Sequence, residues 1–178
     1  ISIVLPGRAE AVQVLSVSEI LFFARAPYTG YLHKLQKTDF EIVENIIEQL
    51  EISTLIKKKL YQLSDGETQK VFLAKALVQD TPVLFLDEPT SHLDIINRIE
   101  IFRMIGKLAK QQNKTILFAS HELDLSLQIA DVCLLFNKKG QVVFGKTEEL
   151  IEQNRIEDFL LEGKYQFNKK LRSVEIKL

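Results

Sequence analysis

The chain has 178 residues, of which 46% are hydrophobic, and its formal net charge is −1. This is enough apolar material for a buried core, and the balanced charge excludes the global basic field that attracts nucleic acid or an anionic membrane surface. The single cysteine, Cys133, excludes an internal disulfide and fits a reducing compartment, and no apolar run approaches the roughly 20 residues that span a bilayer.

The chain opens with a strand signal followed by a helix signal. Residues 1–5 form an apolar run, and because the chain starts within it and without a methionine, we expect a fragment that is truncated at its N-terminus. Ser16 and Glu19 have the Ser/Thr-x-x-Glu spacing of a capping box. We expect the helix that they open to run to Arg25 and to stop before Pro27.

Two further helices are expected before residue 80. Thr38 and Glu41 repeat the capping-box spacing. They open an apolar stripe with the helical period, at Phe40, Val43, Ile46, Ile47 and Leu50. A third helix is expected from about Ser64, and the lysine run at 57–59 is interpreted as a solvated surface without a function.

From residue 82 onward the pattern changes to short apolar runs. Residues 83–86, 115–119 and 132–136 are nearly continuous runs, as in strands of a parallel sheet that is covered on both faces. A helical stripe separates the first two, which predicts a right-handed βαβ unit, with apolar positions at Ile95, Ile99, Phe102, Ile105 and Leu108. Residues 123–129 alternate like a strand, but we favour a helix capped by Ser120, because parallel strands need a crossover.

The C-terminal part is expected to add an antiparallel edge strand at residues 141–144 and a helix from Thr147. The alternation at residues 174–178 predicts a closing strand.

Two adjacent carboxylates follow the strand predicted for residues 83–86. A buried strand that ends in Asp87 would present an oxygen ligand at the sheet edge where α/β proteins bind ligands, which is the Walker B arrangement for Mg²⁺. Glu88 would lie beside a terminal phosphate and could orient or deprotonate an attacking water. The alternative for these residues alone is a strand followed by a solvated acidic turn.

Three other short motifs surround this pair in order along the chain. Residues 63–67 read Leu-Ser-Asp-Gly-Glu, residues 91–94 read Ser-His-Leu-Asp, and His121 follows the strand predicted for 115–119. The four motifs in this order resemble the ABC ATPase family, in which they are the signature, the Walker B motif with its catalytic glutamate, the D-loop and the switch histidine. The resemblance covers nearly the whole chain.

The resemblance implies roles for the signature residues. In the family the signature opens a helix whose N-terminus faces the γ-phosphate bound by the opposite subunit. Ser64 would then bond a phosphate oxygen, and Gly66 would let backbone N–H groups approach. Taken alone, Ser64 and Glu67 are interpreted as a capping box. Asp65 and Glu67 replace a Gly and a Gln of the usual Leu-Ser-Gly-Gly-Gln, and they would repel ATP unless they point away and serve the helix cap.

The implied site comprises Asp87 for Mg²⁺, Glu88 and His121 for hydrolysis, and Ser64, Gly66 and Asp94 for ATP. The other histidines and the cysteine are given structural interpretations. His92 is expected to be a loop residue, His33 a surface residue and Cys133 a core thiol.

Two pieces of the family pattern do not occur in this sequence. There is no Gly-x-x-x-x-Gly-Lys-Ser/Thr, so nothing here can cradle the α- and β-phosphates, and in the family that P-loop lies upstream of Ile1. The family also has a glutamine after its second core strand. Here residues 4–8 read Val-Leu-Pro-Gly-Arg, and Gln13 is out of register.

Residues 15–20 and 24–29 resemble the start of the helical lobe in ATPases that serve ferric-siderophore, haem and cobalamin importers. In the family that lobe docks a helix of the membrane subunit. Phe22, Phe23 and Tyr28 are therefore candidate contacts, and the alternative is that they form the lobe's own core.

We therefore expect an α/β fold: a partial P-loop NTPase core of the RecA type with a parallel sheet, together with an ABC helical subdomain. Residues 7–80 would form the helical subdomain with the signature. Residues 81–178 would form the Walker B half of the core with C-terminal β/α elements.

The resemblance implies an ATPase subunit of an importer for an iron-siderophore, haem or cobalamin-type substrate. The complete protein would hydrolyse MgATP in a homodimer, would lie in the cytoplasm on the inner face of the membrane through its permease subunits, and would need neither nucleic acid nor direct lipid insertion. The fragment alone is expected to be inactive. Two alternatives stay open: a soluble ABC ATPase without a transport role, and a nucleotide-free binding or regulatory module.

Overall fold

The computed structural model describes residues 1–4, 13–29, 34–111, 114–137, 139–157 and 165–176. His33 and residues 5–8, where a glutamine was sought, lie outside the described residues. The chain divides into two compact units, Ile1–Ser120 and His121–Leu178. None of the helices in the described ranges is both long enough and apolar enough to cross a membrane.

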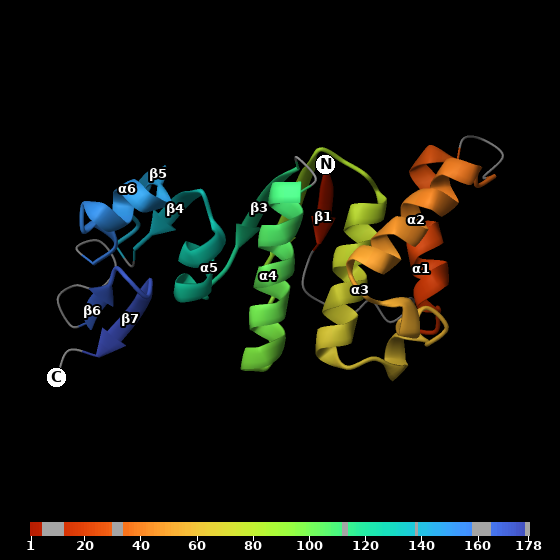
Figure 1. Cartoon of the computed structure of the whole chain (residues 1–178), viewed down its shortest axis with the longest axis horizontal. Helices are drawn as coiled ribbons and strands as arrows, with labels where there is room; N and C mark the ends of the chain where they lie inside the picture. Colours follow the sequence, from red (N-terminus) through yellow and green to blue (C-terminus); the bar gives the residue numbers. More distant parts are fainter. Residues whose placement is uncertain (5–12, 30–33, 112–113, 138, 158–164, 177–178) are drawn as a thin grey trace. The chain divides into compact units, whose positions relative to one another are not determined.

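The first unit combines a sheet with helices, and each main element that the sequence predicts before residue 120 is present (Figure 1). In chain order its elements are β1 (Ser2–Val4), α1 (Val17–Phe23), η2 (Ala26–Tyr28), α2 (Lys37–Gln49), η3 (Ser53–Leu55), η4 (Leu60–Gln62), α3 (Asp65–Val78), β2 (Val83–Asp87), α4 (Ile95–Gln111) and β3 (Thr115–Ala119).

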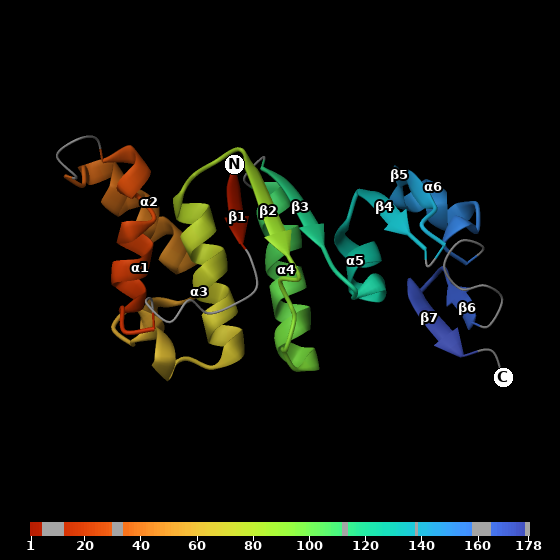
Figure 2. The ribbon, with the colours of Figure 1, turned by 180° about the vertical axis from the view of Figure 1, so that it is seen from behind.

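The sheet of the first unit is parallel, with β2 between β1 and β3 (Figure 2). Leu84 and Leu86 of β2 are buried, as expected for the central strand. Figures 1 and 2 show α4 against one face of this sheet. Because α4 connects the adjacent parallel strands β2 and β3, the predicted βαβ unit is confirmed.

Helix α3 lies at the centre of the first unit. It contacts α1, α2, α4 and β1, and its second half is largely buried and apolar, as a helix segment that is surrounded by protein should be. Its buried apolar residues are Val71, Leu73, Ala74, Ala76, Leu77 and Val78. Because α3 begins at the signature sequence, this packing fixes the position of the signature relative to the sheet.

A buried ion pair joins the C-terminus of α3 to α1 and α2. Arg25, a residue only 7% exposed, donates from Nε to Asp39 Oδ1 at 2.7 Å and from a terminal nitrogen to the Val78 carbonyl at 2.8 Å. Arg25 also lies 4.2 Å from the centre of the Tyr28 ring, and the Tyr28 hydroxyl donates to the Gln79 carbonyl. The last carbonyls of α3, which have no partner within the helix, are satisfied in this way.

The same ion pair explains why one predicted capping box is wrong. α2 starts at Lys37, and Asp39, not Glu41, occupies the third helical position, where its carboxylate accepts the Gln36 N–H at 2.8 Å. Thr38 does not cap the helix. Asp39 is held in place by Arg25, so the helix begins earlier than the Thr38 spacing predicted.

The boxes at Ser16/Glu19 and Ser64/Glu67 are confirmed. α1 ends at Phe23, two residues before the predicted Arg25, and a 3-10 turn that contains Pro27 follows.

The second unit is built from hairpins and two short helices. Its elements are α5 (Leu123–Ile129), β4 (Val132–Phe136), β5 (Val142–Lys146), α6 (Thr147–Glu152), β6 (Tyr165–Asn168) and β7 (Ser173–Ile176). Both sheets are two-stranded and antiparallel. The core of the unit comprises Leu127, Cys133, Val143, Leu150, Ile151, Ile156 and Phe167. Cys133 is a free, buried thiol, as predicted, and burial raises the pKa of this thiol.

The prediction that residues 132–136 join the parallel sheet is wrong. β4 pairs antiparallel with β5, and its buried residue Cys133 alternates with the exposed Val132 and Leu134. The turn that closes the hairpin is fixed locally, because the Asn137 side chain accepts the N–H groups of Lys139 and Gln141. A continuous apolar run therefore marks a strand here but not its partner.

The predicted antiparallel strand near 141–144, the helix from Thr147 and the closing strand near 174 are confirmed by β5, α6 and β7. The predicted helix between Ser120 and β4 is also confirmed as α5. Its expected cap is wrong, because Glu122, not Ser120, precedes the helix and makes no side-chain cap. The crossover that favoured a helix is not its cause either, because β4 does not pair in parallel with β3.

Replacing Asp39 with Asn should lower the free energy of unfolding by about 3–5 kcal/mol, because Arg25 would keep a buried charge without its counter-charge. Urea unfolding at neutral pH, followed by circular dichroism, measures the change. Glu41→Gln is the matched control: it breaks only the exposed Lys37–Glu41 pair of the same helix and should cost less than about 0.5 kcal/mol. Equal losses for the two variants would contradict the prediction.

The pH dependence of stability should show the same contribution of Asp39. The Gln36 N–H and then Arg25 lower the pKa of Asp39 below its ordinary value. A lowered pKa stabilises the folded state fully above the ordinary aspartate range, and the contribution is lost as the pH falls through the folded-state pKa. The wild type should therefore lose more stability than Asp39→Asn on acidification.

Candidate active site

Asp87 and Glu88 lie at the carboxyl edge of the parallel sheet, where the sequence predicts them. Asp87 is the last residue of β2, is exposed, and is in register with Ala119, the last residue of β3. Glu88 extends this pairing, because its N–H donates to the Ala119 carbonyl at 3.0 Å. Both carboxylates therefore start from backbone that is fixed by two neighbouring strands.

The Glu88 backbone adopts a left-handed conformation, with φ of 44°. Such a conformation costs a residue other than glycine about 1–3 kcal/mol, and it persists where neighbouring contacts enforce it. Here both main-chain groups are held, since the N–H binds Ala119 and the carbonyl accepts the Ser91 N–H at 3.1 Å. The turn thereby sets the direction in which the Glu88 side chain leaves the end of the strand.

The loop between β2 and α4 is anchored by buried residues and ends in a helix cap. Thr90 and Leu93 are buried, and the exposed His92 is left-handed at φ 64°. Asp94 then caps α4: its Oδ1 accepts the Asn97 N–H at 3.0 Å and its Oδ2 accepts from Asn97 Nδ2 at 2.6 Å. These two donors lower the pKa of Asp94. His92 is a loop residue, as predicted.

The signature opens α3 through a complete capping box. The Ser64 N–H donates to Glu67 Oε2 at 2.8 Å, and the Glu67 N–H donates to Ser64 Oγ at 3.2 Å. Lys58 Nζ lies 3.1 Å from Glu67 Oε1. The Ser64 N–H first, and then Lys58, lower the pKa of Glu67. The unusual glutamate of this signature therefore serves the helix cap and is paired with a cation.

From the sequence, the lysine run at 57–59 is interpreted as a solvated surface without a function; two of its lysines are partly exposed and also bind capping-box glutamates. Lys58 pairs with Glu67 of α3, and Lys59 Nζ lies 3.8 Å from Glu19 Oε2 of α1. The backbone of this run also accepts the Val17 N–H, through the Lys58 carbonyl. The run thus ties the N-terminus of α1 to that of α3.

Gly66 is buried against the side chain of Asn97, not open to solvent. A Cβ placed on Gly66 would lie 2.5 Å from Asn97 Oδ1 and 2.6 Å from Asn97 Cγ. The close approach of α4 is thus sufficient to require a glycine at position 66. The approach of a phosphate, which the family resemblance implies, would be a second reason. Sequence reasoning missed Asn97, although its position three residues after the cap Asp94 is a signal that could have found it.

His121 is the first residue of the second unit, which begins directly after Ser120. Its side chain is exposed, and its carbonyl accepts the Leu123 N–H at 3.0 Å at the start of α5. Asp87, Glu88, Asp94, Ser64 and Gly66 all belong to the first unit.

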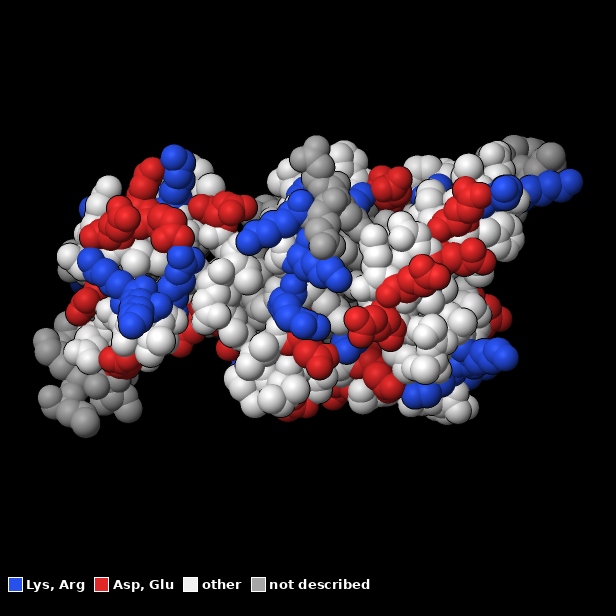
Figure 3. All heavy atoms as spheres, in the orientation of Figure 1, with Lys and Arg blue, Asp and Glu red and all other residues white. Residues whose placement is uncertain are grey.

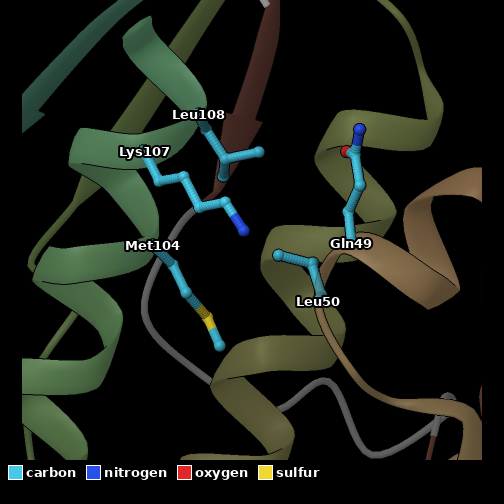
Figure 4. Close-up of a pocket in the computed structure, with 5 residues that line it drawn as sticks. All are labelled: Gln49, Leu50, Met104, Lys107 and Leu108. Atoms are coloured by element: carbon cyan, nitrogen blue, oxygen red, sulfur yellow. The ribbon is translucent and has the colours of Figure 1, made fainter. Parts of the chain in front are cut away.

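The surface over the two outer helices carries opposite charges. Figure 3 shows Lys and Arg side chains gathered over α4 and Asp and Glu side chains over α2. A small hollow of about 20 Å³ between these helices is lined by Gln49, Leu50, Met104, Lys107 and Leu108 (Figure 4). This volume fits one water molecule, and the hollow includes none of the residues predicted for the site. It is not the place where a nucleotide would bind.

The aromatic residues considered as partner contacts differ in exposure. Phe23 is 74% exposed and Tyr28 48% exposed. Phe22 is half-buried and packs on the Phe40 ring at 5.1 Å between centroids. Phe22 thus belongs in part to the packing of α1 on α2, whereas Phe23 is available at the surface.

The chain is similar to known proteins in sequence and in fold. Residues 8–91 match the family model described as ABC transporter. The iron(3+)-hydroxamate import ATP-binding protein FhuC of Bacillus subtilis is 32% identical over 140 residues, 79% of this chain and 52% of its own length. The petrobactin import ATP-binding protein FpuD of Bacillus anthracis is 29% identical over 155 residues, 87% of this chain and 57% of its own length.

A solved ABC transporter in an inward-facing conformation has the same fold. It matches with a TM-score of 0.77 and 24% identity, over 99% of this chain and 71% of that chain. The chain spans about half the length of the curated relatives that it matches.

Lys58→Met should raise the pKa of Glu67 while leaving it below its ordinary value, because the Ser64 N–H still binds the carboxylate. NMR titration of the Glu67 carboxyl measures this shift. Stability at neutral pH should fall by less than about 1 kcal/mol, since the pair is partly exposed. Lys57→Met, which removes the exposed first lysine of the run, is the control. An unchanged Glu67 pKa in Lys58→Met would contradict the assignment of the pair.

Proposed function

Because this chain belongs to the ABC transporter family of ATP-binding proteins, we propose that it supplies the Walker B, signature and switch elements of an importer's ATPase subunit. The observation that carries the proposal is the pair Asp87–Glu88 at the end of β2, with the Glu88 backbone held in a left-handed turn by Ala119 and Ser91. The imported substrate would be an iron-siderophore, haem or cobalamin-type chelate. Support comes from the relatives named for import of iron(3+)-hydroxamate and petrobactin.

Asp87 fits a magnesium ligand. It is an exposed carboxylate at the carboxyl end of a parallel strand, the position at which α/β sheets bind ligands. No group of three or more His, Cys, Asp or Glu side chains in the described ranges is placed to hold a metal ion. Mg²⁺ keeps several water ligands and is bound through one or two carboxylates together with phosphates, so the proposed magnesium site needs no more than the Asp87 carboxylate from this part of the chain. When bound, Mg²⁺ would neutralise charge on the β- and γ-phosphates.

Glu88 is proposed as the residue that orients the attacking water and accepts its proton. His121 is proposed as the second catalytic residue, in contact with the γ-phosphate. Hydrolysis would be an in-line attack of water on that phosphate. The pinned backbone at Glu88 supports the proposal, because a catalytic base must hold its carboxylate within hydrogen-bond reach of the water.

Ser64 and Gly66 are proposed to act on the nucleotide of a second copy. The α3 N-terminus carries an exposed Ser64, and its dipole favours an anion. The Ser64 hydroxyl oxygen accepts the Glu67 N–H within the cap, and its O–H donates to the Glu67 carboxylate. On binding, a phosphate oxygen would replace that carboxylate as the acceptor of the Ser64 proton. Lys58 offsets the Glu67 charge beside the site. Asp94 would be the D-loop aspartate that faces the same dimer interface.

The working assembly would then be a homodimer of the ATPase subunit on the cytoplasmic side of its membrane permease subunits. The exposed Phe23 and Tyr28 are candidates for the permease contact. A transport role is favoured over a soluble ABC ATPase or a nucleotide-free module, because the relatives described above are named as import ATP-binding proteins.

Glu88→Gln should separate binding from hydrolysis. In a polypeptide that carries both this chain and a P-loop, the variant should bind MgATP and dimerise as the unmodified protein does. Its turnover should fall at least about 100-fold, because proton transfer by a positioned base contributes roughly 10²–10⁴ in rate. Light scattering with MgATP and phosphate release measure the two properties. Turnover equal to that of the unmodified protein would remove Glu88 from this role, and no ATPase activity in the unmodified polypeptide would sink the proposed function.

The 178-residue chain alone should bind MgATP with a dissociation constant well above the micromolar range. Its sequence has no Gly-x-x-x-x-Gly-Lys-Ser/Thr to cradle the α- and β-phosphates. Titration calorimetry of the chain with MgATP measures the affinity. Micromolar binding would show that other residues of this chain hold the nucleotide.

A further inference from the structure

One side chain connects the D-loop to the signature helix within this chain. Asn97, in the first turn of α4, occupies both carboxylate oxygens of Asp94: its main-chain N–H binds Oδ1 at 3.0 Å and its side-chain Nδ2 binds Oδ2 at 2.6 Å. The other end of the same amide is turned to Gly66, where an added Cβ would lie 2.5 Å from Asn97 Oδ1. The amide thus fills the space between Asp94 and the N-terminus of α3.

From this contact we propose that Asn97 is a positioning residue that couples the signature at Gly66 to the D-loop aspartate Asp94. The Asn97 amide makes both contacts through one planar group, so a shift of the amide away from Gly66 changes the geometry of its hydrogen bond to Asp94. A displacement at Gly66 is therefore passed to Asp94, although no contact between these two residues is needed.

A second contact, an ion pair, also joins α3 to α4. Lys70 Nζ lies 2.7 Å from Glu100 Oε2, one turn further along α3 and α4 from the Gly66–Asn97 contact. The interface between α3 and α4 (here called the seam) thus has contacts at two successive helical turns. A movement of the α3 N-terminus would therefore move the first turn of α4 as well. Asn97 is the residue of this seam that also bonds the D-loop carboxylate.

The coupling would affect ATP hydrolysis. This consequence rests on the proposed function. The α3 N-terminus is proposed to meet the γ-phosphate held by a second copy, and Asp94 is proposed to face the same interface. Phosphate binding at the signature would then shift Gly66, and Asn97 would pass this shift to the D-loop of the same copy.

The first test needs no nucleotide and uses the 178-residue chain. Gly66→Ala should push the Asn97 amide off Asp94 and so raise the pKa of the Asp94 carboxyl towards its ordinary value, since a lost donor disfavours the charged form. NMR titration of Asp94 measures this shift. Hydrogen exchange at the start of α4 should become faster in the same variant. An Asp94 pKa and exchange rate equal to those of the wild type would overturn the proposal.

A double-mutant cycle identifies Asn97 as the carrier. Asn97→Ala alone should also raise the Asp94 pKa, and in this background Gly66→Ala should add no further shift. Equal effects of Gly66→Ala with and without Asn97 would overturn the proposal. Asn97→Leu keeps the bulk against Gly66 but removes the donor, so it tests the hydrogen bond without opening the seam. Asn45→Ala, at an exposed position of α2, is the matched control and should leave the Asp94 pKa unchanged.

The second test follows turnover in a polypeptide that carries this chain and a P-loop. Asn97→Leu should lower kcat about tenfold and change the KM for ATP less than about threefold, within the range typical of coupling between sites. An unchanged kcat with only a lower melting temperature would show a purely structural role and overturn the proposal. If the unmodified polypeptide hydrolyses no ATP, the proposed function fails, and the Asp94 titration still decides the coupling.

Discussion

The carboxyl edge of the first unit depends on the parallel pairing of β2 with β3, which continues one residue beyond the strands. The Glu88 N–H binds the Ala119 carbonyl at 3.0 Å, and this bond holds the chain in a left-handed turn at φ 44°. Without it, Asp87 and Glu88 would leave β2 in the alternating directions of an ordinary strand. The strain at Glu88 is offset by the hydrogen bonds of its N–H and carbonyl to Ala119 and Ser91. A device of this kind is typical of a functional site and has no evident value for stability.

The helix caps of α3 and α4 are the second feature that organises this edge. They stabilise each helix locally and also set the position of one helix relative to the other. In α3 the Glu67 carboxylate binds the Ser64 N–H and Lys58. These contacts offset part of the negative charge with which Glu67 would otherwise repel a phosphate. In α4 the cap is Asp94, and its partner Asn97 also touches Gly66 of α3. Two helix N-termini are thus brought together by residues at the positions proposed for the signature and the D-loop. A residue needed for local capping can in this way set the geometry between two motifs.

Much of this arrangement could be predicted from the sequence, and the failures have definite physical causes. The run at 83–86 followed by two acids predicted β2 and the place of Asp87, because a buried strand and its polar end are local signals. The box at Thr38 was wrong because the buried Arg25–Asp39 pair, a long-range contact, moved the helix start. The partner of β4 was wrong because apolar content reveals that a strand is buried but not which strand it pairs with. Asn97 was missed because its role depends on the packing of α4 against Gly66.

The electrostatics of the first unit bear on the proposal that these motifs form one part of a nucleotide site. Asp87 ends β2, Glu88 and Asp94 lie on the connection from β2 to α4, and Asp65 and Glu67 open α3. A triphosphate brought to these carboxylates would be repelled unless cations and N–H donors faced it from another segment. Lys58 is engaged with Glu67, Lys70 with Glu100, and Arg25 is buried at the opposite end of α3. The described cations near this edge therefore serve the fold, and the acids are suited to hold a metal and a water once a phosphate cradle supplies the positive field.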